Sequence, residues 1–330
     1  MKYSKAHITS IIFIEVLKVL GGYKKPLTFR EISNLLNQRD INPDRKTLKS
    51  LIEDMLNEGY IQENKKGFII TDLGMDVLKK STVFERMDEF TETIQYNLHM
   101  ATFDLYRMKG TVPVNIAMID KDKMEDALAI IDRLAHSKLV VSDLILICDE
   151  EEMVGDIVIQ EGKVGIVTLS TTIYDVIARN INVILEPYAA GLLHYSDFRP
   201  EGLVELISYE GTTISPGLLF IKGGYTSVLN AMRTGNGYVV SDIRNVSPHM
   251  IKLVERELFL AEARGISNAI ATLYPRRIPF DLLIDRKVKL IFPTGLNYFA
   301  PLQEAGFDPE MRINETLIEF SKLKPVEDMY

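Results

Sequence analysis

The sequence has almost no cysteine: Cys148 is the only one in 330 residues. A single cysteine excludes a disulfide within the chain and any zinc or iron–sulfur site built from several thiolates. Such a composition suits a reducing compartment, so we expect a cytoplasmic protein. Long apolar runs are missing as well, since Glu15 and Lys18 interrupt the most apolar stretch near the start, Ile8 to Leu20. We therefore expect neither a membrane span nor a secretory signal.

The common signatures of catalysis are also absent. The sequence contains no Gly-x-x-x-x-Gly-Lys-Ser/Thr phosphate loop, no Gly-x-Gly-x-x-Gly fingerprint and no Gly-x-Ser-x-Gly elbow. The histidines are scattered without the spacing of metal ligands: His7, His99, His136, His194 and His249. We interpret Cys148 as a small buried hydrophobic residue. These absences predict a protein that is not an enzyme and that holds no metal and no cofactor.

Acidic residues dominate the chain as a whole, with a net charge of −8, but they do not dominate its first quarter. Residues 1–80 contain 14 Lys or Arg and 10 Asp or Glu, which leaves a charge of +4. The other 250 residues contain 24 basic and 36 acidic side chains, which leaves −12. Opposite signs in the two regions indicate a module that faces nucleic acid, attached to an acidic body.

The first eighty residues predict three helices. The stretch from Ile8 to Leu20 places its apolar residues on one helical face. Thr28 and Glu31 have the spacing of a capping box at the start of a second helix. Asn42-Pro43 fits the N-cap and the first position of a third helix, because proline fixes a helical φ.

The third predicted helix has two different faces. Its apolar stripe follows helical spacing through Leu48, Leu51, Ile52, Met55 and Leu56. Polar and basic side chains lie opposite and beside the stripe: Lys46, Thr47, Lys49 and Ser50. A recognition helix needs this layout, because apolar residues hold it to its domain while polar groups face the major groove.

A hairpin with a basic tip is predicted next, where two short strands flank Asn64-Lys65-Lys66-Gly67. We therefore predict a winged helix-turn-helix over residues 1–80. The polar face of its third helix meets the major groove of double-stranded DNA, and Lys65 and Lys66 contact phosphate. The alternative is a three-helix module that binds another protein and whose lysines form a solvated face.

Residues 81–110 predict a connecting helix, because Ser81 to Met108 contains no proline or glycine. Its apolar residues recur close to a heptad seam: Val83, Met87, Phe90, Ile94, Leu98, Ala101, Leu105 and Met108. Two readings stay open: the helix packs along its own effector domain, or it forms a seam between two chains. Both fit a twofold protein that reads an inverted repeat.

Residues 111–325 alternate between strand and helix patterns. Val114 to Ile119 suits a strand, Met124 to Leu134 suits a helix, and Leu144 to Ile147 suits a buried strand. We predict an α+β (mixed α/β) fold, in which a larger mixed-sheet effector domain follows the winged helix and the connecting helix.

Several polar stretches in this domain indicate an anion site. Ser170, Thr171 and Thr172 stand where a predicted strand meets a helix, and hydroxyls and free amides at such a junction bind carboxylates. The stretch from Lys222 to Ser227 precedes another predicted helix, which Arg233 follows. Each stretch alone also fits a helix cap or a surface ion pair. Together they predict a small-anion sensor whose effector contacts are Ser170, Thr171, Thr172, Thr213 and Arg233.

Three sequence motifs are more specific to a protein family. They are Glu161-Gly162-Lys163-Val164-Gly165-Ile166, Tyr209-Glu210-Gly211-Thr212-Thr213 with Pro216 close behind, and Thr226-Ser227-Val228 leading into Arg233-Thr234-Gly235-Asn236-Gly237. With these motifs, and with a winged helix that precedes the effector domain, the chain resembles the archaeal nitrogen-regulation repressors, the NrpR family. The resemblance covers essentially the whole chain. It departs from the family at Leu169, where members often have a cysteine, and over Leu185 to Gly191.

The resemblance implies a homodimeric transcriptional repressor of nitrogen-assimilation genes that binds an inverted-repeat operator. It also implies release from the DNA by the effector 2-oxoglutarate, whose two carboxylates match the small-anion sensor. One copy of the body fills Val112 to about Lys324, so a second NrpR-type subunit would come from another chain. The alternatives are a corepressor or scaffold whose winged helix binds another regulator, and an enzyme that acts on a small acid.

Overall fold

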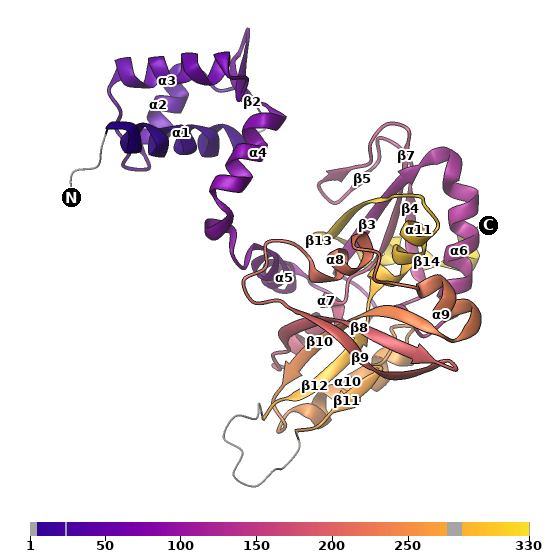
Figure 1. Ribbon diagram of the computed structural model, residues 1–330. Helices are drawn as coiled ribbons and strands as arrows, with labels where there is room; N and C mark the ends of the chain where they lie inside the picture. Colours follow the sequence, from indigo (N-terminus) through magenta and orange to yellow (C-terminus); the bar gives the residue numbers. More distant parts are fainter. Residues whose placement is uncertain (1–4, 24, 276–285, 330) are drawn as a thin grey trace. The chain divides into compact units, whose positions relative to one another are not determined.

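The structure is a computed structural model that describes residues 5–23, 25–275 and 286–329 (Figure 1). The chain forms two compact units, residues 1–87 and residues 88–330, which we call the helical unit and the sheet unit. Helices and strands alternate along the sheet unit, so the predicted mixed α/β fold is confirmed. Within the described residues, no helix has the length and apolar character needed to span a bilayer.

The helical unit carries a hairpin between its third and fourth helices. Its elements are α1 (Lys5–Gly21), α2 (Phe29–Asn37), α3 (Arg45–Asn57), β1 (Ile61–Asn64), β2 (Gly67–Ile70) and α4 (Asp72–Ser81). Val16, Leu36 and Leu48 are buried in one core that the first three helices share. Ile61 pairs with Ile70 across the hairpin. Three helices followed by a hairpin is the order of elements that we predicted for residues 1–80.

Side-chain caps set the helix starts in this unit. Thr28 and Glu31 form the predicted capping box, with Glu31 Oε2 2.8 Å from the Thr28 amide. The predicted start of the third helix at Asn42-Pro43 is wrong, because Asp44 is the N-cap and α3 begins at Arg45. The Asp44 carboxylate accepts hydrogen bonds from the amide and the hydroxyl of Thr47, at 2.9 and 2.7 Å. A carboxylate at this position accepts hydrogen bonds from free amides and interacts favourably with the positive end of the helix dipole.

The single connecting helix predicted over residues 81–110 is broken in the structure. α4 ends at Ser81, the 3₁₀ turn η1 covers Val83–Arg86, and α5 covers Glu89–Met100. Asp88 interrupts the helical path with a φ of +66°, and its carboxylate accepts a hydrogen bond from the Gly211 amide at 2.6 Å. A contact with a residue distant in sequence therefore overrides the local helical pattern.

α5 belongs to the sheet unit, where it contacts α7 and β13. Of the two readings of the apolar seam, the structure supports packing against the chain's own body, and it does so only for α5. After Met100 the chain leaves the helix, and Asp104 pairs with Lys109 in an isolated bridge. The apolar periodicity of residues 101–108 therefore does not reflect a helix.

Two five-stranded sheets form the frame of the sheet unit. In spatial order, the first contains β13 (Glu310–Glu319), β3 (Thr111–Asp120), β7 (Lys163–Leu169), β4 (Leu144–Cys148) and β14 (Lys324–Pro325). The second contains β11 (Ala271–Leu273), β12 (Val288–Pro293), β10 (Gly237–Val246), β8 (Glu186–Ser196) and β9 (Arg199–Ser208). We expected a mixed sheet, but the strand pairings that the structure describes here are all antiparallel.

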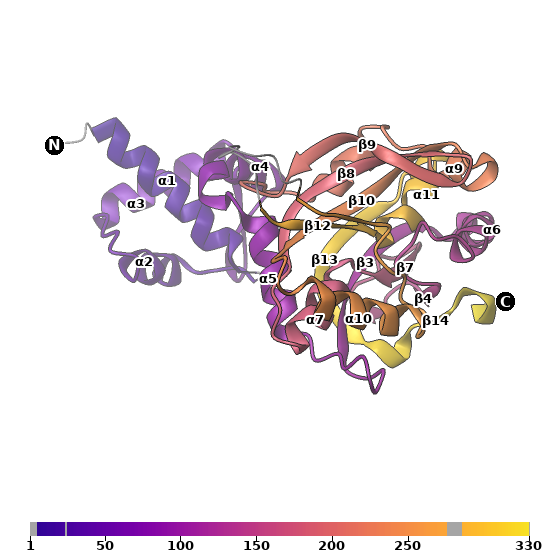
Figure 2. The ribbon, with the colours of Figure 1, turned by 90° about the horizontal axis from the view of Figure 1, so that it is seen from below.

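Helices and short turns cover these sheets. They are η2 (Lys121–Lys123), α6 (Met124–Ala135), α7 (Thr172–Asn180), α8 (Pro216–Lys222), α9 (Val228–Thr234), α10 (Ile251–Glu262), η3 (Gly295–Tyr298), α11 (Ala300–Glu304), η4 (Phe320–Lys322) and η5 (Val326–Met329). A small hairpin, β5 (Met153–Val154) with β6 (Ile157–Val158), lies outside the sheets. Figure 2 shows α7 next to α10, and the two helices are in contact. β3 and β10 are buried along almost their whole length, so both faces of these two strands are covered, whereas β9 at the edge of the second sheet is largely exposed.

The sheet unit repeats one order of elements. We call one set of elements the first half: β3–α6–β4–β7–α7–β8. The second half has the same order: β10–α10–β11–β12–η3/α11–β13. Each half gives its last strand to the other sheet, since β8 pairs with β10 and β13 pairs with β3. The registers also agree: Asn115 faces Ile313 in the first sheet, and Asp242 faces Ala190 in the second. The halves therefore have equivalent positions that can be compared residue by residue.

Candidate functional site

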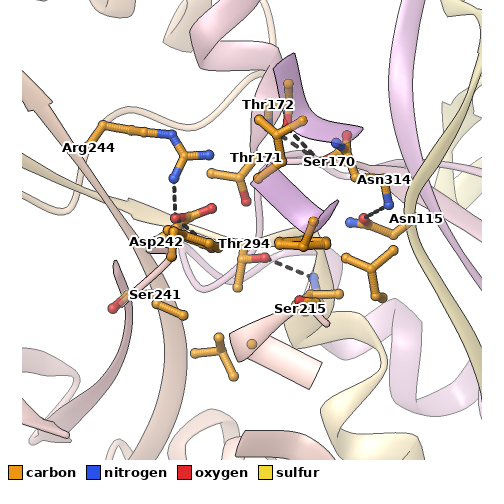
Figure 3. Close-up of a pocket in the computed structure, with 18 residues that line it drawn as sticks. Asn115, Ser170, Thr171, Thr172, Ser215, Ser241, Asp242, Arg244, Thr294 and Asn314 are labelled. Carbon is orange, nitrogen blue, oxygen red and sulfur yellow. Dashed lines mark hydrogen bonds and ion pairs between the residues drawn. The ribbon is translucent and has the colours of Figure 1, made fainter. Parts of the chain in front are cut away.

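A polar cavity, which we call the central cavity, is lined by residues of both sheets and of α5 (Figure 3). The buried polar residues of its wall are Asn115, Ser170, Thr171, Thr172, Ser215, Ser241, Asp242, Arg244, Thr294 and Asn314. The cavity volume is about 20 Å³, which is room for about one water molecule. The polar side chains of the wall therefore leave little free space between them.

Each half contributes a junction between a strand and a helical turn. Ser170 follows β7, and its Oγ accepts a hydrogen bond from the Thr172 amide at 3.4 Å. Thr294 follows β12, and its Oγ1 accepts one from the Leu296 amide at 3.2 Å. The two hydroxyls thus make the same local turn at equivalent positions, and both face the cavity.

The two junctions touch each other. Thr168 Oγ1 donates a hydrogen bond to the Gly295 carbonyl at 3.3 Å. A Cβ added to Gly295 would lie 2.1 Å from the carbonyl oxygen of Leu169, so no larger residue fits without a backbone shift. Glycine at 295 is what lets the second half approach the end of β7.

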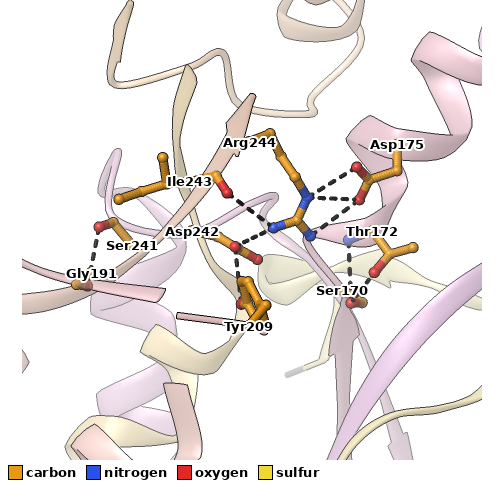
Figure 4. Close-up of polar contacts among 9 residues, drawn as sticks. All are labelled: Ser170, Thr172, Asp175, Gly191, Tyr209, Ser241, Asp242, Ile243 and Arg244. Atoms are coloured by element: carbon orange, nitrogen blue, oxygen red, sulfur yellow. Dashed lines mark hydrogen bonds and ion pairs between the residues drawn. The ribbon is translucent and has the colours of Figure 1, made fainter. Parts of the chain in front are cut away.

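A buried charged network borders the cavity (Figure 4). Arg244 Nε lies 3.0 Å from Asp175 Oδ1, and Arg244 Nη2 lies 3.2 Å from Asp175 Oδ2. Arg244 Nη1 donates to Asp242 Oδ1, which also accepts the hydroxyl of Tyr209 at 3.0 Å. The side chains of Arg244 and Asp175 are each 1% exposed. These contacts tie α7 of the first half to β10 of the second.

Burial opposes the ionisation of both carboxyls in this network. It raises the pKa of Asp175 to about 6, against the opposing effect of the Arg244 guanidinium. Burial also raises the pKa of Asp242, which Arg244 and Tyr209 lower in part. Two carboxylates with one guanidinium leave one surplus negative charge when both are ionised. The three guanidinium nitrogens of Arg244 already donate to acceptors of the protein.

The structure brings three of the five predicted effector residues together. Ser170, Thr171 and Thr172 line the central cavity. Thr213 lines an adjoining pocket, which shares Phe90 and Ser215 with the cavity. Arg233 does not join them, because it is exposed in the last turn of α9 and does not line either space. The arginine that lines the cavity is Arg244 and not the predicted Arg233.

The predicted anion site before α9 is already filled by the protein itself. The amides of Val228 and Leu229 at the start of α9 donate to the two carboxylate oxygens of Glu304, at 2.8 and 2.9 Å. The stretch from Lys222 to Ser227 therefore leads into a helix start that does attract a negative group, as expected from the free amides. That group is a side chain of α11 in this structure.

The predicted DNA contacts lie at the surface of the helical unit. Most of them are exposed: Lys46, Lys49, Ser50, Lys65 and Lys66. Thr47 is half-buried, and its hydroxyl is bonded to Asp44 at the helix start. Thr47 thus has a structural role whether or not it meets a base. Contact of these residues with DNA stays a prediction.

Cys148 is buried, as predicted, and burial raises the pKa of its thiol to about 11. A thiol with so high a pKa is a poor nucleophile at neutral pH. Over residues 5–23, 25–275 and 286–329, no group of His, Cys, Asp and Glu side chains is arranged to hold a metal ion.

Sequence reasoning missed several polar residues of the cavity wall: Asn115, Asp242, Arg244, Thr294 and Asn314. It also missed Asp175, which binds Arg244 but does not line the cavity. The available signal was the strand Gly237 to Val246, in which Asp242 and Arg244 interrupt an apolar run. Charged residues are almost never fully buried unless they are paired. Asn314 gave no such signal, because its backbone conformation is not visible in the sequence.

A family model described as NrpR regulatory domains NRD1 and 2 matches residues 87–325. A global nitrogen regulator NrpRI from Methanosarcina mazei is 24% identical over 315 residues, which cover 95% of this chain and 97% of that relative. A global nitrogen regulator NrpR from Methanocaldococcus jannaschii is 25% identical over 314 residues, or 94% of this chain. Those residues cover 54% of that relative, so the chain spans about half its length.

Among solved structures, a nitrogen repressor-like protein from Methanococcus jannaschii is similar, with a TM-score of 0.57 and 19% identity. The match covers 71% of this chain and 97% of that protein, and at this identity it shows a shared fold. The family model, in contrast, matches well over half of the sequence at residues 87–325. The chain therefore belongs to the NrpR family of nitrogen regulators.

Proposed function

We propose that this chain is a transcriptional repressor of nitrogen-assimilation genes, which binds DNA through its helical unit and a small dicarboxylate through its sheet unit. The observation that carries the proposal is the extent of the match to a named nitrogen regulator, 95% of this chain and 97% of the relative. The match runs through both units, so it supports one regulator rather than a regulatory domain joined to an unrelated module. Membership of a regulator family also argues against an enzyme.

The helical unit supplies the surface for DNA. The start of α3 presents Lys46, Lys49 and Ser50 to solvent on the side away from its buried leucines. Lys65 and Lys66 are exposed at the tip of the β1–β2 hairpin, where they can reach phosphate beside the groove. Two such units in a homodimer would read the two halves of an inverted-repeat operator.

The sheet unit supplies the effector site. The hydroxyls of Ser170, Thr171 and Thr172 and the start of α7 suit a carboxylate, so 2-oxoglutarate is the effector that we propose. A cavity of about 20 Å³ is too small for this acid, so the ligand has to bind a more open arrangement of the two halves. A ligand that binds only the open arrangement shifts the population towards it, and this shift would lower the affinity for DNA.

Selection of bound sequences from random DNA duplexes tests the proposal without a known operator. We expect the full chain to enrich an inverted repeat, and 2-oxoglutarate to weaken binding to the enriched sequence in fluorescence anisotropy. Absence of any salt-sensitive DNA binding would overturn the DNA-binding role and favour the alternative of a corepressor. DNA binding that 2-oxoglutarate leaves unchanged would overturn the effector alone.

The hairpin lysines provide a sharper test of the DNA surface. Each phosphate contact contributes about −0.9 to the slope of log K against log salt concentration. The double variant Lys65→Ala/Lys66→Ala should therefore weaken binding to all sequences and reduce the slope by about 1–2. Lys138→Ala, in the sheet unit, is the matched control and should leave the slope unchanged. An unaltered slope in the double variant would remove the hairpin from the DNA surface.

A further inference from the structure

The side chain of Asn314 is buried in the wall of the central cavity without a hydrogen-bond partner. It is 1% exposed, and neither its Oδ1 nor its Nδ2 has a partner among the residues that the structure describes. The Asn314 backbone, in contrast, is engaged: its N–H donates to Asn115 Oδ1 at 3.1 Å, and its carbonyl accepts from the side-chain amide of Asn97. Native proteins rarely leave a buried amide unpaired, because its desolvation is not compensated. The unpaired Asn314 amide is therefore available to hydrogen-bond a group that enters the cavity.

The backbone also holds Asn314 in an uncommon conformation. Its φ is +56°, and it lies in a bulge where the register of β13 against β3 shifts between Ile313 and Thr316. At the equivalent place in β8, the last strand of the first half, Ala190 and Gly191 continue a regular pairing with β10. Bulges re-aim side chains, and local strain gathers at binding sites. The bulge in β13 is thus a local departure from the repeated fold that turns Asn314 into the cavity wall.

The start of α7 lines the same cavity, and Figure 3 places Asn314 beside Ser170. α7 has nine residues, and its N-cap Thr171 makes no side-chain capping bond. The Thr172 amide has only the long bond of 3.4 Å to Ser170 Oγ. The amides of Ile173 and Tyr174 donate to the carbonyls of Ser170 and Thr171, at 3.0 and 3.1 Å, so the Thr172 amide is the weakly satisfied one. Such an amide at a helix start attracts a negative group. An anion at this helix start would also face the side-chain amide of Asn314, which lines the same cavity.

Arg244 does not compete for such an anion. It is the single cation among the described residues that line the cavity, and its nitrogens donate to Asp175 and Asp242. Asp242 also lines the cavity and would repel a carboxylate at that end. The neutral donors around Ser170 and Asn314 therefore form the end of the cavity that suits a carboxylate.

We propose that Asn314 is the residue with which the sheet unit recognises a carboxylate of its effector, a small organic acid seated against the start of α7. Asn314 Nδ2 donates to one carboxylate oxygen, and the hydroxyls of Thr171 and Thr172 donate to the other. Asn314 Oδ1 accepts a hydrogen bond from a hydroxyl or a water that enters with the acid. This inference rests on the proposal that the cavity is the effector site. It assigns recognition to a neutral amide instead of the arginine expected from the sequence.

The experiment compares Asn314→Gly with the wild type, by calorimetry with 2-oxoglutarate and with glutarate and by urea unfolding. Glycine accepts a positive φ, so the variant should be as stable as the wild type or more stable, while its Kd for the acid rises about tenfold or more. A residue with a merely structural role would lose stability and binding together. Asn182→Gly is the matched control, because Asn182 has a φ of +59° and is exposed, and it should bind as the wild type does.

Asn314→Asp is a second variant that keeps the size of the side chain and should also bind about tenfold more weakly, because its carboxylate repels the ligand. Unchanged affinity of both variants would overturn the role of Asn314 and leave the effector site standing. Wild-type binding of glutarate but not of 2-oxoglutarate, lost in Asn314→Gly, would support the role of Asn314 and reject 2-oxoglutarate as the effector. A wild type that binds neither acid would overturn the inference.

Discussion

The two halves of the sheet unit share an order of strands and helices but differ in what they bring to the central cavity. The first half contributes Asn115 and Ser170. The second half has Asp242 where the first has Asn115, and Thr294 where the first has Ser170. Ala117 occupies the place equivalent to Arg244. Two halves with the same order of elements thus form one cavity that has a neutral end and a charged end. The difference between the ends comes from a few side chains.

The charged end should dominate stability. Arg244→Leu leaves Asp175 and Asp242 buried without their cation, and breaking a buried ion pair in this way costs about 3–5 kcal/mol. Urea unfolding at pH 7 measures the loss. The triple variant Asp175→Asn/Asp242→Asn/Arg244→Leu is the control and should recover much of it, because no unpaired charge remains. A loss below about 1 kcal/mol in Arg244→Leu would mean that the network is not desolvated as the structure shows.

The pH dependence of stability should reveal the charged end of the cavity. The folded pKa of Asp175 is about 6 and its unfolded value is 3.8, so the folded protein binds the proton more tightly. Stability should therefore fall as the pH rises from about 4 to about 6, by up to about 3 kcal/mol at roughly 1.4 kcal/mol per pKa unit, and change no further from this group above that window.

Asp175→Asn should remove that part of the pH dependence, which unfolding in urea at a series of pH values would measure. Asn115, the neutral counterpart of Asp242, cannot titrate, so Asn115→Ala should leave the shape of the profile unchanged even if it lowers the stability. A profile that is identical in wild type and Asp175→Asn would show that Asp175 does not titrate in this range.

The contact between the two junctions should show a smaller effect. Gly295→Ala forces a Cβ towards the carbonyl of Leu169, and a strained insertion of this kind costs about 1–3 kcal/mol. Gly202→Ala is the control: a Cβ at Gly202 meets nothing within 4 Å, so alanine there should be neutral or stabilising. Equal stability of the two variants would contradict the close approach of the halves. Thermal unfolding measures both.

Local patterns in the sequence predicted the helical unit well, because its elements are set by nearby residues. The Thr28–Glu31 box and the apolar stripe of α3 are examples. The helix expected over residues 81–110 is interrupted at Asp88, whose carboxylate binds the amide of Gly211, a contact across the fold.

The candidate site was predicted only in part for the same reason. Ser170 to Thr172 carry a local signal, since they join a strand to a helix. Arg233 has the chemistry of an anion ligand but lies at the surface, whereas Arg244 is aimed at the cavity by the register of β10 against β8 and β12. Register and backbone conformation also decide the place of Asn314, and neither can be deduced from composition or spacing.

The exchange of β8 and β13 has a mechanical consequence. Each sheet is completed by a strand that begins in the other half, and these borrowed strands carry Ala190 and Ile313 along the cavity wall. The halves cannot swing apart like two bodies on one hinge, because both crossing strands would have to leave their sheets. A ligand that widens the cavity would instead have to displace both β8 and β13. Because each of these strands belongs to one half and pairs in the sheet of the other, neither half could move without the other.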